Sequence, residues 1–341
     1  MSVTRIGLMG FGRVGRDLFR LLYRRRDLRV AAIHDDHDPK SLEYLLQFDT
    51  LQGRFPTEVS VHGQHLYVDG QQIPLLSEKR GDDLSWGALG VDVVVVASGD
   101  PVSRASAERH LERGATRVVL CVPPLDPPDL SVVPGINDDQ LRDEHRILSN
   151  SSCTAHAVAP ILRILEGAFG IERAFLSTVH AYTDDQRLAD VPAEEPRRGR
   201  AAAENIIPQA TDAAEVISGL VPELRGRLQA MAMNVPVPNG SVIDLVCWHR
   251  KPVSITAVNE VVRTAIAGES FRDLLAYEDD PIVSSDILKT PHSGTFDALG
   301  TMVLGEKVSK TLTWFDNSWG YSHRVVELIE KLATLGRREV A

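Results

Sequence analysis

The amino-acid sequence predicts an α/β fold, in which a doubly wound domain on a parallel sheet precedes a domain built on a second sheet. Two observations support this prediction. In the first part of the chain, short apolar runs alternate with segments whose apolar residues recur at helical spacing. One run, residues 91–97 (VDVVVVA), is apolar at nearly every position, as expected for a parallel strand that is buried on both faces.

The first half is expected to form four strands and two helices, the strands at residues 4–9, 28–33, 91–97 and 117–122 and the helices at 16–25 and 101–114. The first helix carries Leu18, Phe19, Leu21 and Leu22 at helical spacing, and Gly114 is expected to end the second helix. This alternation is typical of a doubly wound domain.

The second half is expected to add strands at residues 173–182, 231–237, 241–249 and 311–315 and helices at 157–166, 213–220 and 324–335. Residues 184–200 are polar and basic and contain Pro192 and Pro196. Such a stretch is too long for a simple turn, and ordered loops of that length are usually functional. The boundary between the domains is expected near residues 149–153.

Composition limits the classes of protein to which the chain can belong. Its 341 residues correspond to about two domains, and 43% apolar and 25% charged residues are close to globular averages. Lys plus Arg number 37 and Asp plus Glu 47, which gives a net charge of −10. An acidic chain is a poor general binder of polyanions, so neither nucleic acid nor an anionic membrane is expected as a partner.

The cysteines and the N-terminus indicate a cytoplasmic protein. Cys121, Cys153 and Cys247 form no CxxC pair, so a disulfide framework and a Cys-based zinc site are not expected, and we expect no metal. The first apolar run is short and rich in glycine, unlike a signal peptide, and no run reaches the length of about 20 residues typical of a transmembrane helix.

A GxGxxG motif follows the first expected strand and opens the first expected helix, which is the arrangement of a Rossmann-type dinucleotide site. Its residues are Gly10, Phe11, Gly12, Arg13, Val14 and Gly15. Asp35 lies twenty positions after Gly15, at the end of the second expected strand, where a carboxylate holds the ribose hydroxyls of the adenosine. Asp36 adds a second carboxylate that would repel a 2′-phosphate, so NAD is favoured over NADP.

Cys153 lies in the segment SNSSCTAH (149–156), directly before an expected helix. The positive end of a helix dipole lowers a thiol pKa and favours the thiolate, so Cys153 is the expected nucleophile. Cys121 and Cys247 lie in apolar runs and are expected to be inert core residues.

A catalytic cysteine needs a base, and His180, in the segment TVHAYT (178–183) at the end of an expected strand, is the leading candidate. His156 lies three residues after Cys153 and is the competing candidate.

Together these segments resemble the phosphorylating glyceraldehyde-3-phosphate dehydrogenase family, and the resemblance runs along essentially the whole chain. The matching segments are GFGRVGR (10–16), LLQFDTLQGRF (45–55), SNSSCT (149–154), TVHAYT (178–183), RAAAENIIP (200–208), VPELRGRL (221–228), NVPVPNGSVIDL (234–245), PHSGTFDA (291–298) and WFDNSWGYSHRV (314–325).

The resemblance implies two domains. Residues 1–152 with the C-terminal helix 319–341 form a Rossmann-type NAD domain, and residues 153–318 form an α+β catalytic domain with a mostly antiparallel sheet. It also implies a homotetramer. Ser98 lies near the nicotinamide, Asn317 orients its amide, and Tyr321 lies beside that site. The Cys153 thiolate attacks a small-molecule aldehyde, His180 accepts the proton, and a thioester forms while NAD takes the hydride.

The expected substrate and anion site is made of residues at the positions where this family binds two anions. These residues are Ser152, Thr154, Thr183, Asp185, Arg197, Thr211, Asp212 and Asn234. Two of them depart from the family pattern: Asn234 stands where the family has an arginine, and Asp212 stands where it has a glycine. One unit charge about 4 Å away is worth roughly 4 kcal/mol at an effective dielectric of about 20, so both changes weaken phosphate binding if the side chains face the site.

Three hypotheses follow. In the first, the chain is a divergent paralogue that keeps the Cys–His–NAD chemistry but uses another aldehyde or acyl acceptor. In the second, Arg187, Arg197, Arg198 or Arg200 supplies the missing charge, and the chain is an ordinary phosphorylating glyceraldehyde-3-phosphate dehydrogenase. In the third, the chain is a non-catalytic NAD-binding interaction protein.

Overall fold

The computed structural model describes residues 3–77 and 85–335 and divides the chain into two compact units. Unit 1 takes the described residues within 1–132, 139–151 and 322–341, and unit 2 takes residues 133–138 and 152–321. The chain therefore changes unit between Ser151 and Ser152 and between Tyr321 and Ser322, close to the expected domain limits, and residues 133–138 belong to unit 2.

Unit 1 is built on a nine-stranded sheet with the order β10-β11-β9-β8-β1-β2-β7-β6-β5. The strands are β1 (Thr4–Met9), β2 (Leu28–His34), β5 (Val59–His62), β6 (His65–Val68), β7 (Gln71–Leu76), β8 (Val93–Val96), β9 (Arg117–Leu120), β10 (Leu130–Ser131) and β11 (Ile147–Ser149). From β10 to β7 all neighbours are parallel, whereas β7, β6 and β5 pair antiparallel. A short hairpin of β3 (Phe48–Asp49) and β4 (Gly53–Arg54) stands apart from this sheet.

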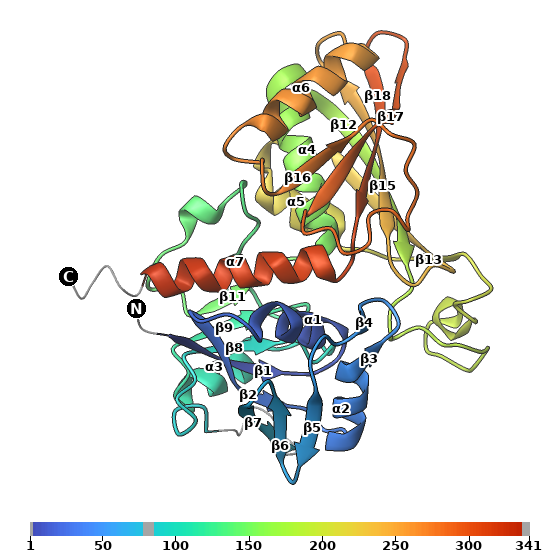
Figure 1. Ribbon diagram of the computed structural model, residues 1–341. Helices are drawn as coiled ribbons and strands as arrows, with labels where there is room; N and C mark the ends of the chain where they lie inside the picture. Colours follow the sequence, from blue (N-terminus) through green and yellow to red (C-terminus); the bar gives the residue numbers. More distant parts are fainter. Residues whose placement is uncertain (1–2, 78–84, 336–341) are drawn as a thin grey trace. The chain divides into compact units, whose positions relative to one another are not determined.

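Helices cover both faces of the unit 1 sheet, as in a doubly wound fold (Figure 1). They are α1 (Arg13–Leu22), α2 (Pro39–Gln47), α3 (Arg104–Glu112) and α7 (Trp319–Leu335), of which α7 belongs to unit 1 from Ser322 onward. Buried valines of β8 and β9 form part of the core, as their uninterrupted apolar run predicts.

Unit 2 is built on a seven-stranded sheet with the order β13-β14-β12-β15-β18-β17-β16. The strands are β12 (Ile171–Ala181), β13 (Ile207–Gln209), β14 (Leu228–Val235), β15 (Ser241–His249), β16 (Leu275–Glu278), β17 (Gly294–Leu304) and β18 (Val308–Phe315). Only β12–β14 and β16–β17 are parallel pairs, so the sheet is mostly antiparallel, as expected.

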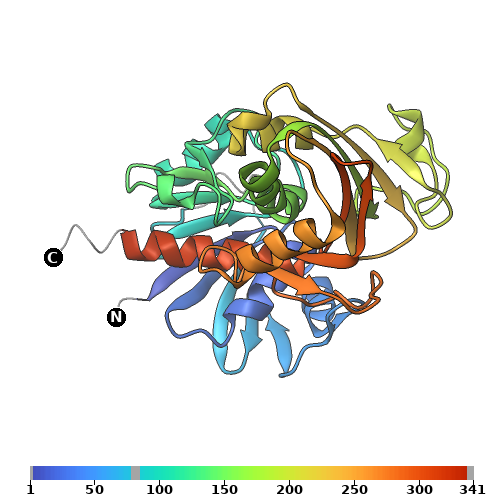
Figure 2. The same ribbon diagram turned by 90° about the horizontal axis from the view of Figure 1, so that it is seen from above.

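One face of the unit 2 sheet is covered by helices, and the core lies between them and the sheet (Figure 2). These helices are α4 (Cys153–Phe169), α5 (Ala213–Leu220) and α6 (Ile255–Ala267). The long polar stretch before β13 contains one short 3₁₀ helix, Pro196–Gly199. The other short 3₁₀ helices of the described chain are Asp138–Gln140 and Pro222–Leu224.

Several expected element limits are wrong. α4 begins at Cys153 rather than residue 157, because the Ser152 hydroxyl caps it by accepting from Ala155 N (3.1 Å). α7 begins at Trp319, where the resemblance places the start of the C-terminal helix, rather than at residue 324 as the apolar pattern predicts, because the buried Asp316 carboxylate accepts the backbone N–H groups of Ser318 and Trp319. Cys121 lies beyond the end of β9 and is half-buried, so it is not the buried strand residue that we expected.

Within the described residues, no helix has both the length and the apolar character needed to cross a membrane.

Candidate active site

The three glycines of the GxGxxG motif have different local surroundings. Gly10 has a φ of +98°, and a Cβ there would lie 2.4 Å from the carbonyl oxygen of Ala97. A Cβ on Gly15 would lie 2.2 Å from Gly10 O, so this glycine permits close packing of α1 on the loop. A Cβ on Gly12, at the N-cap of α1, would meet nothing within 4 Å. The loop thus leaves open space where a pyrophosphate would approach the helix N-terminus.

This loop lies where the strand order reverses, because β1 lies between β2 and β8 in the sheet. Gly10 follows β1, and Ser98 lies just beyond β8. The backbone N of Ser98 comes within 2.6 Å of where a Gly10 Cβ would lie, and Ser98 itself is exposed. Two of the expected cofactor residues are therefore neighbours at the carboxyl ends of adjacent parallel strands.

Asp35 braces the glycine loop. Its Oδ2 accepts from Phe11 N (2.8 Å), and its Oδ1 accepts from His37 N (3.0 Å) and lies 2.7 Å from His37 Nδ1. Burial by itself raises the pKa of the Asp35 carboxyl, but the N–H groups of Phe11 and His37 and the His37 ring bring the pKa below its ordinary value of 3.8. Asp35 is therefore held as a carboxylate. The sequence analysis did not single out His37.

The remaining motif residues lie at the start of α1. The Phe11 ring is buried and packs edge-on against Phe19, with 5.7 Å between the ring centroids, so only its backbone faces Asp35. Arg13 and Val14 are the first two residues of α1 and are half-buried. The residues present fit a dinucleotide: an open glycine loop, a helix N-terminus and an ionised carboxylate at the end of β2.

In unit 2 the sulfur of Cys153 lies 3.8 Å from Nε2 of His180. Cys153 is the first residue of α4, and His180 is the second-last residue of β12. The Nδ1 atom of His180 lies 2.6 Å from the carbonyl oxygen of Ala181. Since a carbonyl only accepts, Nδ1 carries the proton and neutral His180 presents Nε2 as an acceptor toward the thiol. This is the arrangement of a nucleophile with an adjacent base.

Asn317 and Ser241 hold this pair. Asn317 Nδ2 lies 3.0 Å from His180 Nε2, while Asn317 Oδ1 accepts from the Ser241 hydroxyl at 2.8 Å. The same hydroxyl oxygen accepts from Ala181 N at 2.9 Å, and Ser241 is fully buried. Ser241 thereby sets which end of the Asn317 amide faces His180. Ser241 lies in the matching segment 234–245 but was not a candidate site residue, because only the pairing of β15 with β12 brings it to His180.

The helix N-terminus was expected to lower the pKa of the Cys153 thiol. This expectation is wrong, because the sum of all influences raises that pKa. Burial raises the pKa of the Cys153 thiol to about 11. The N–H groups of Cys153 and Thr154 at the start of α4 and the Thr154 hydroxyl act in the expected direction, but burial outweighs them, and the Asp316 carboxylate adds to the rise. The resting group is therefore a thiol. The fully buried Cys247 also has a raised pKa because of burial.

His156, the competing base, is buried within α4, and its ring packs edge-on against the buried Tyr321 with centroids 5.9 Å apart. Both residues belong to unit 2. This packing gives His156 and Tyr321 a structural setting in the described chain, whereas the contact with the Cys153 sulfur comes from His180.

Part of the expected anion site gathers beside His180. Asn234 on β14 is paired in register with His180 on β12, and its side chain is 6% exposed. The Asn234 amide donates to Gln186 Oε1, which also accepts from Thr183 N at 3.1 Å. The Thr183 hydroxyl donates to Asp185, and Asp185 forms an ion pair with Arg198. Gln186 was not singled out from the sequence. The register partner of His180 on this side is therefore an amide that is hydrogen-bonded to a second amide.

The other expected anion residues are more dispersed. Thr211 Oγ1 accepts from Ala213 N at 3.2 Å, and Asp212 is the exposed N-cap residue of α5, with no side-chain capping bond. Arg197 is exposed on the 3₁₀ helix Pro196–Gly199. In the described parts of the chain, no three His, Cys, Asp or Glu side chains group as ligands for a metal ion.

Comparisons with known proteins identify the family of both parts of the chain. Residues 4–104 match the profile of the glyceraldehyde 3-phosphate dehydrogenase NAD binding domain, and residues 152–317 match that of the glyceraldehyde 3-phosphate dehydrogenase C-terminal domain.

Curated relatives match along nearly the whole chain. The sequence is 43% identical over 334 residues to the glyceraldehyde-3-phosphate dehydrogenase of Geobacillus stearothermophilus, covering 98% of this chain and 99% of the relative. It is 44% identical over 326 residues to the enzyme of the same name from Streptomyces coelicolor, covering 95% and 97%. It is 43% identical over 333 residues to that of Mycobacterium leprae, covering 96% and 97%.

Proposed function

Since this chain belongs to the glyceraldehyde-3-phosphate dehydrogenase family and is an NAD-dependent oxidoreductase, we propose that Cys153 and His180 carry out its chemistry on an aldehyde. The observation that supports this assignment is the 3.8 Å separation of Cys153 Sγ and His180 Nε2, with Nδ1 engaged by Ala181 O. No observation favours the hypothesis of a non-catalytic NAD-binding protein, and the Cys153–His180 pair argues against it.

The raised pKa of Cys153 determines how the nucleophile forms. With a pKa of about 11, only about one thiol in ten thousand is ionised at pH 7. His180 Nε2 therefore takes the thiol proton as the sulfur bonds to the aldehyde carbon and returns it to the resulting oxyanion, which leaves a thiohemiacetal hydroxyl on the Cys153 adduct and a neutral His180. The N–H groups at the start of α4, that of Cys153 first, are placed to stabilise the developing oxyanion.

The glycine loop of unit 1 would hold NAD, which would supply the acceptor for the hydride of the aldehyde carbon. His180 takes the proton of the thiohemiacetal hydroxyl, and a thioester remains on Cys153. An acyl acceptor then attacks the thioester carbon, and the bond to sulfur breaks. The proposed cofactor residues are the glycine-loop residues, Asp35 and Ser98 in unit 1 and Asn317 and Tyr321 in unit 2. Within unit 2, Asn317 contacts His180 and is oriented by Ser241.

We further propose that the acyl acceptor or the aldehyde differs from that of a phosphorylating enzyme. The residue in register with His180 is the buried Asn234, whose amide donates a hydrogen bond to Gln186. Asp185 already neutralises Arg198, and Asp212 adds an exposed carboxylate at the start of α5. The expected anion site offers few cations to a doubly charged phosphate. Its residues are Ser152, Thr154, Thr183, Asp185, Arg197, Thr211, Asp212 and Asn234. Water, another uncharged nucleophile or an aldehyde without phosphate fits it better.

A second candidate function, phosphorylating glyceraldehyde-3-phosphate dehydrogenase, is favoured by the names of the relatives at 43–44% identity. In that case the exposed Arg197, or one of its neighbours in residues 184–200, supplies the charge that Asn234 lacks.

A steady-state assay separates the two candidates. NADH formation is measured with NAD and glyceraldehyde 3-phosphate, with and without inorganic phosphate, for the wild type and Cys153→Ser. A divergent acceptor predicts Cys153-dependent activity on an aldehyde without any requirement for phosphate. Robust activity that depends on phosphate would instead establish the second candidate. Activity that persists in Cys153→Ser would overturn the assignment of the nucleophile.

We also propose that the two units are the NAD domain and the catalytic domain, and that the chain acts as a cytoplasmic homotetramer with small-molecule partners only. The side of the unit 2 sheet away from its core supports assembly. On that side Phe175 and Met231, on neighbouring strands, are 55% and 44% exposed. Sedimentation of the purified protein tests the oligomeric state.

A further inference from the structure

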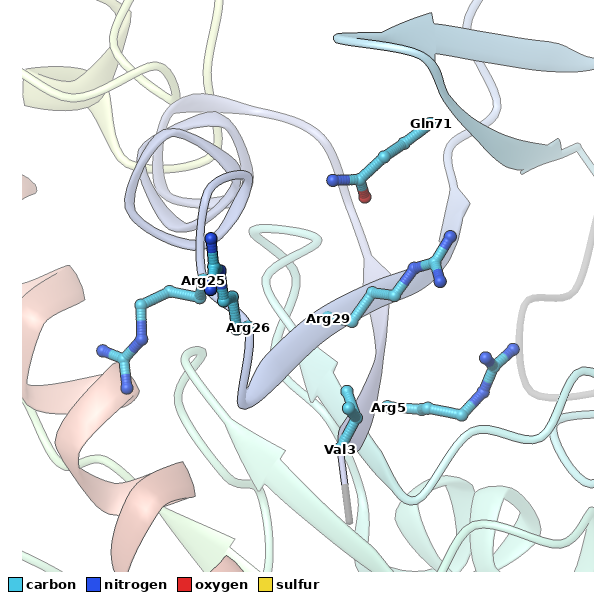
Figure 3. Close-up of a pocket in the computed structure, with 6 residues that line it drawn as sticks. All are labelled: Val3, Arg5, Arg25, Arg26, Arg29 and Gln71. Atoms are coloured by element: carbon cyan, nitrogen blue, oxygen red, sulfur yellow. The ribbon is translucent and has the colours of Figure 1, made fainter. Parts of the chain in front are cut away.

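A cavity of about 460 Å³ in unit 1 is lined largely by arginine side chains (Figure 3). Its lining residues are Val3, Arg5, Arg25, Arg26, Arg29 and Gln71. Four guanidinium groups around one cavity contrast with the net charge of −10 of the chain. The cavity is a local positive site on an acidic protein, and none of the chemistry described above uses it.

The cavity lies at the amino ends of the parallel strands. Arg5 is the second residue of β1, Arg29 is the second residue of β2, and Gln71 is the first residue of β7. The glycine loop and Asp35 follow the carboxyl ends of β1 and β2. At about 3.3 Å per residue, a strand the length of β1 separates the two places by roughly 15 to 20 Å. The cavity is therefore distinct from the dinucleotide motif.

Three of the four arginines keep their positive charge uncompensated within the described chain. Arg25 is neutralised, since its Nη2 lies 2.6 Å from Asp27 Oδ2 and 2.5 Å from Glu330 Oε1, and Figure 3 shows it pointing toward α7. Arg5 donates from Nε and Nη2 to the carbonyls of Gly90 and Leu89, which hold its guanidinium in place but carry no charge.

Arg26 and Arg29 are exposed, and no described carboxylate lies within ion-pair distance of their guanidinium groups. Figure 3 shows Arg29 directed toward the side of the cavity where Gln71 lies. Gln71 Nε2 donates to Tyr23 O at 3.2 Å, which leaves its amide oxygen as an acceptor. Two exposed cations, Arg26 and Arg29, and one hydrogen-bonded cation, Arg5, thus line the cavity together with one neutral acceptor.

We propose that this cavity binds an anion that carries a chain of phosphates. Guanidinium forks match phosphate oxygens in geometry and charge, and a volume of about 460 Å³ holds far more than one phosphate ion. Three cations suit an oligophosphate better than a single carboxylate. The ligand is either an inorganic oligophosphate or a nucleoside triphosphate, whose sugar hydroxyls or base amino groups match the Gln71 acceptor.

The test is calorimetric titration of the full-length protein, saturated with NAD so that the glycine loop is occupied. Sodium tripolyphosphate, ATP and inorganic phosphate are the three probes. We expect one binding site per chain for tripolyphosphate and ATP, and binding of inorganic phosphate at least about tenfold weaker. Tighter binding of ATP than of tripolyphosphate identifies the nucleotide as the source, and equal binding identifies the inorganic chain.

Three variants locate the site. Arg26→Gln and Arg29→Gln are each expected to weaken tripolyphosphate binding about tenfold or more, and together more strongly. Arg24→Gln is the matched control. Arg24 is exposed in the same connection between α1 and β2 but does not line the cavity, and its substitution removes the same charge. Its effect is expected to stay below about threefold, through long-range screening alone. Unfolding temperature and NAD affinity report whether each variant is folded.

Three results would overturn the proposal: no binding of either oligophosphate to the NAD-saturated protein, unchanged binding in the double variant, or an equal loss in Arg24→Gln, which would indicate diffuse charge rather than a site. The catalytic assignment is tested by NADH formation, so a failure here and a failure there remain distinguishable.

Discussion

Asn234 and His180 are register partners on the neighbouring parallel strands β14 and β12, so an uncharged amide lies beside the proposed base. The Asn234 amide donates a hydrogen bond to Gln186 Oε1, which also accepts from Thr183 N. The network that begins at Asn234 reaches a cation only at Arg198, whose charge is paired with Asp185. An anion that binds on this side of the site therefore needs a positively charged partner from another part of the chain.

The double substitution Asn234→Arg with Asp212→Gly is expected to lower the KM for inorganic phosphate by about tenfold or more, since it adds a cation and removes an anion. Steady-state rates against phosphate concentration measure this. Asp212→Gly alone is the control for the smaller, exposed change. An unchanged KM would mean that these side chains do not face the acyl acceptor.

Replacement of Cys153 by Ser is expected to reduce kcat by at least about a thousandfold, because the hydroxyl is a far weaker nucleophile than a thiolate. Cys121→Ser is a matched control, since Cys121 is also half-buried. NAD affinity, measured by fluorescence quenching, should be unchanged in both variants. Comparable losses in the two variants would argue against a special role for Cys153.

Alkylation of Cys153 by iodoacetamide without NAD is expected to accelerate about tenfold per pH unit between pH 7 and 10, because burial raises the thiol pKa to about 11 and only the thiolate reacts. Labelling rates followed by mass spectrometry give this profile. A plateau that begins near pH 7 would show that the helix N-terminus outweighs burial.

Ser241→Ala is expected to lower kcat and to shift the pH dependence of kcat, because Asn317 loses the donor that sets its orientation toward His180. Two buried hydrogen bonds are lost, so the free energy of unfolding should also fall by about 1–3 kcal/mol. Ser309→Ala is the matched control, since this buried serine bonds His249 instead. A pH profile that moves equally in both variants would make the role of Ser241 merely structural.

Asp35→Asn is expected to weaken NAD binding about ten- to a hundredfold, because the loop loses the carboxylate that accepts from Phe11 N and faces the ribose position. Asp36→Asn, at an exposed neighbour, is the control. Since the folded-state pKa of Asp35 lies below 3.8, its carboxylate stabilises the fold above that pH. This contribution is lost as the pH falls through the lowered pKa. In Asp35→Asn, the free energy of unfolding should therefore lack the part of its acid decrease that comes from protonation of Asp35.

The sequence predicted the elements whose pattern is local. The valine run of β8 and the glycine loop needed only neighbouring residues to be recognised, and α5 was expected at its observed limits. The hairpins β5–β7 and the strand β17 were missed, because β7 contains Pro74, and β17 contains Gly294 and Gly300 and shifts register after Asp297. These strands are stabilised by their partners rather than by their own propensity.

The candidate site divides in the same way. Cys153 and His180 follow from motifs, and the structure brings them together. Gln186 lies outside every segment that matches the family, and Ser241 lies in one without a pattern that marks its role. Both roles depend on strand pairing and on a loop that returns to β14. The thiol pKa was expected with the wrong sign, because burial depends on the packed environment and the sequence shows only the helix start.

The assignment of residues to units has a consequence for synthesis on the ribosome. Unit 2 is almost one continuous stretch, residues 152–321, preceded only by residues 133–138. Unit 1 begins at the N-terminus but includes α7 from Ser322 onward, whose Glu330 pairs with Arg25. The domain that is translated first is therefore completed last. Premature termination after residue 321 would spare every residue of unit 2 and leave unit 1 without its last helix. Since unit 1 is discontinuous along the chain, exchange of either unit between homologues needs more than one crossover.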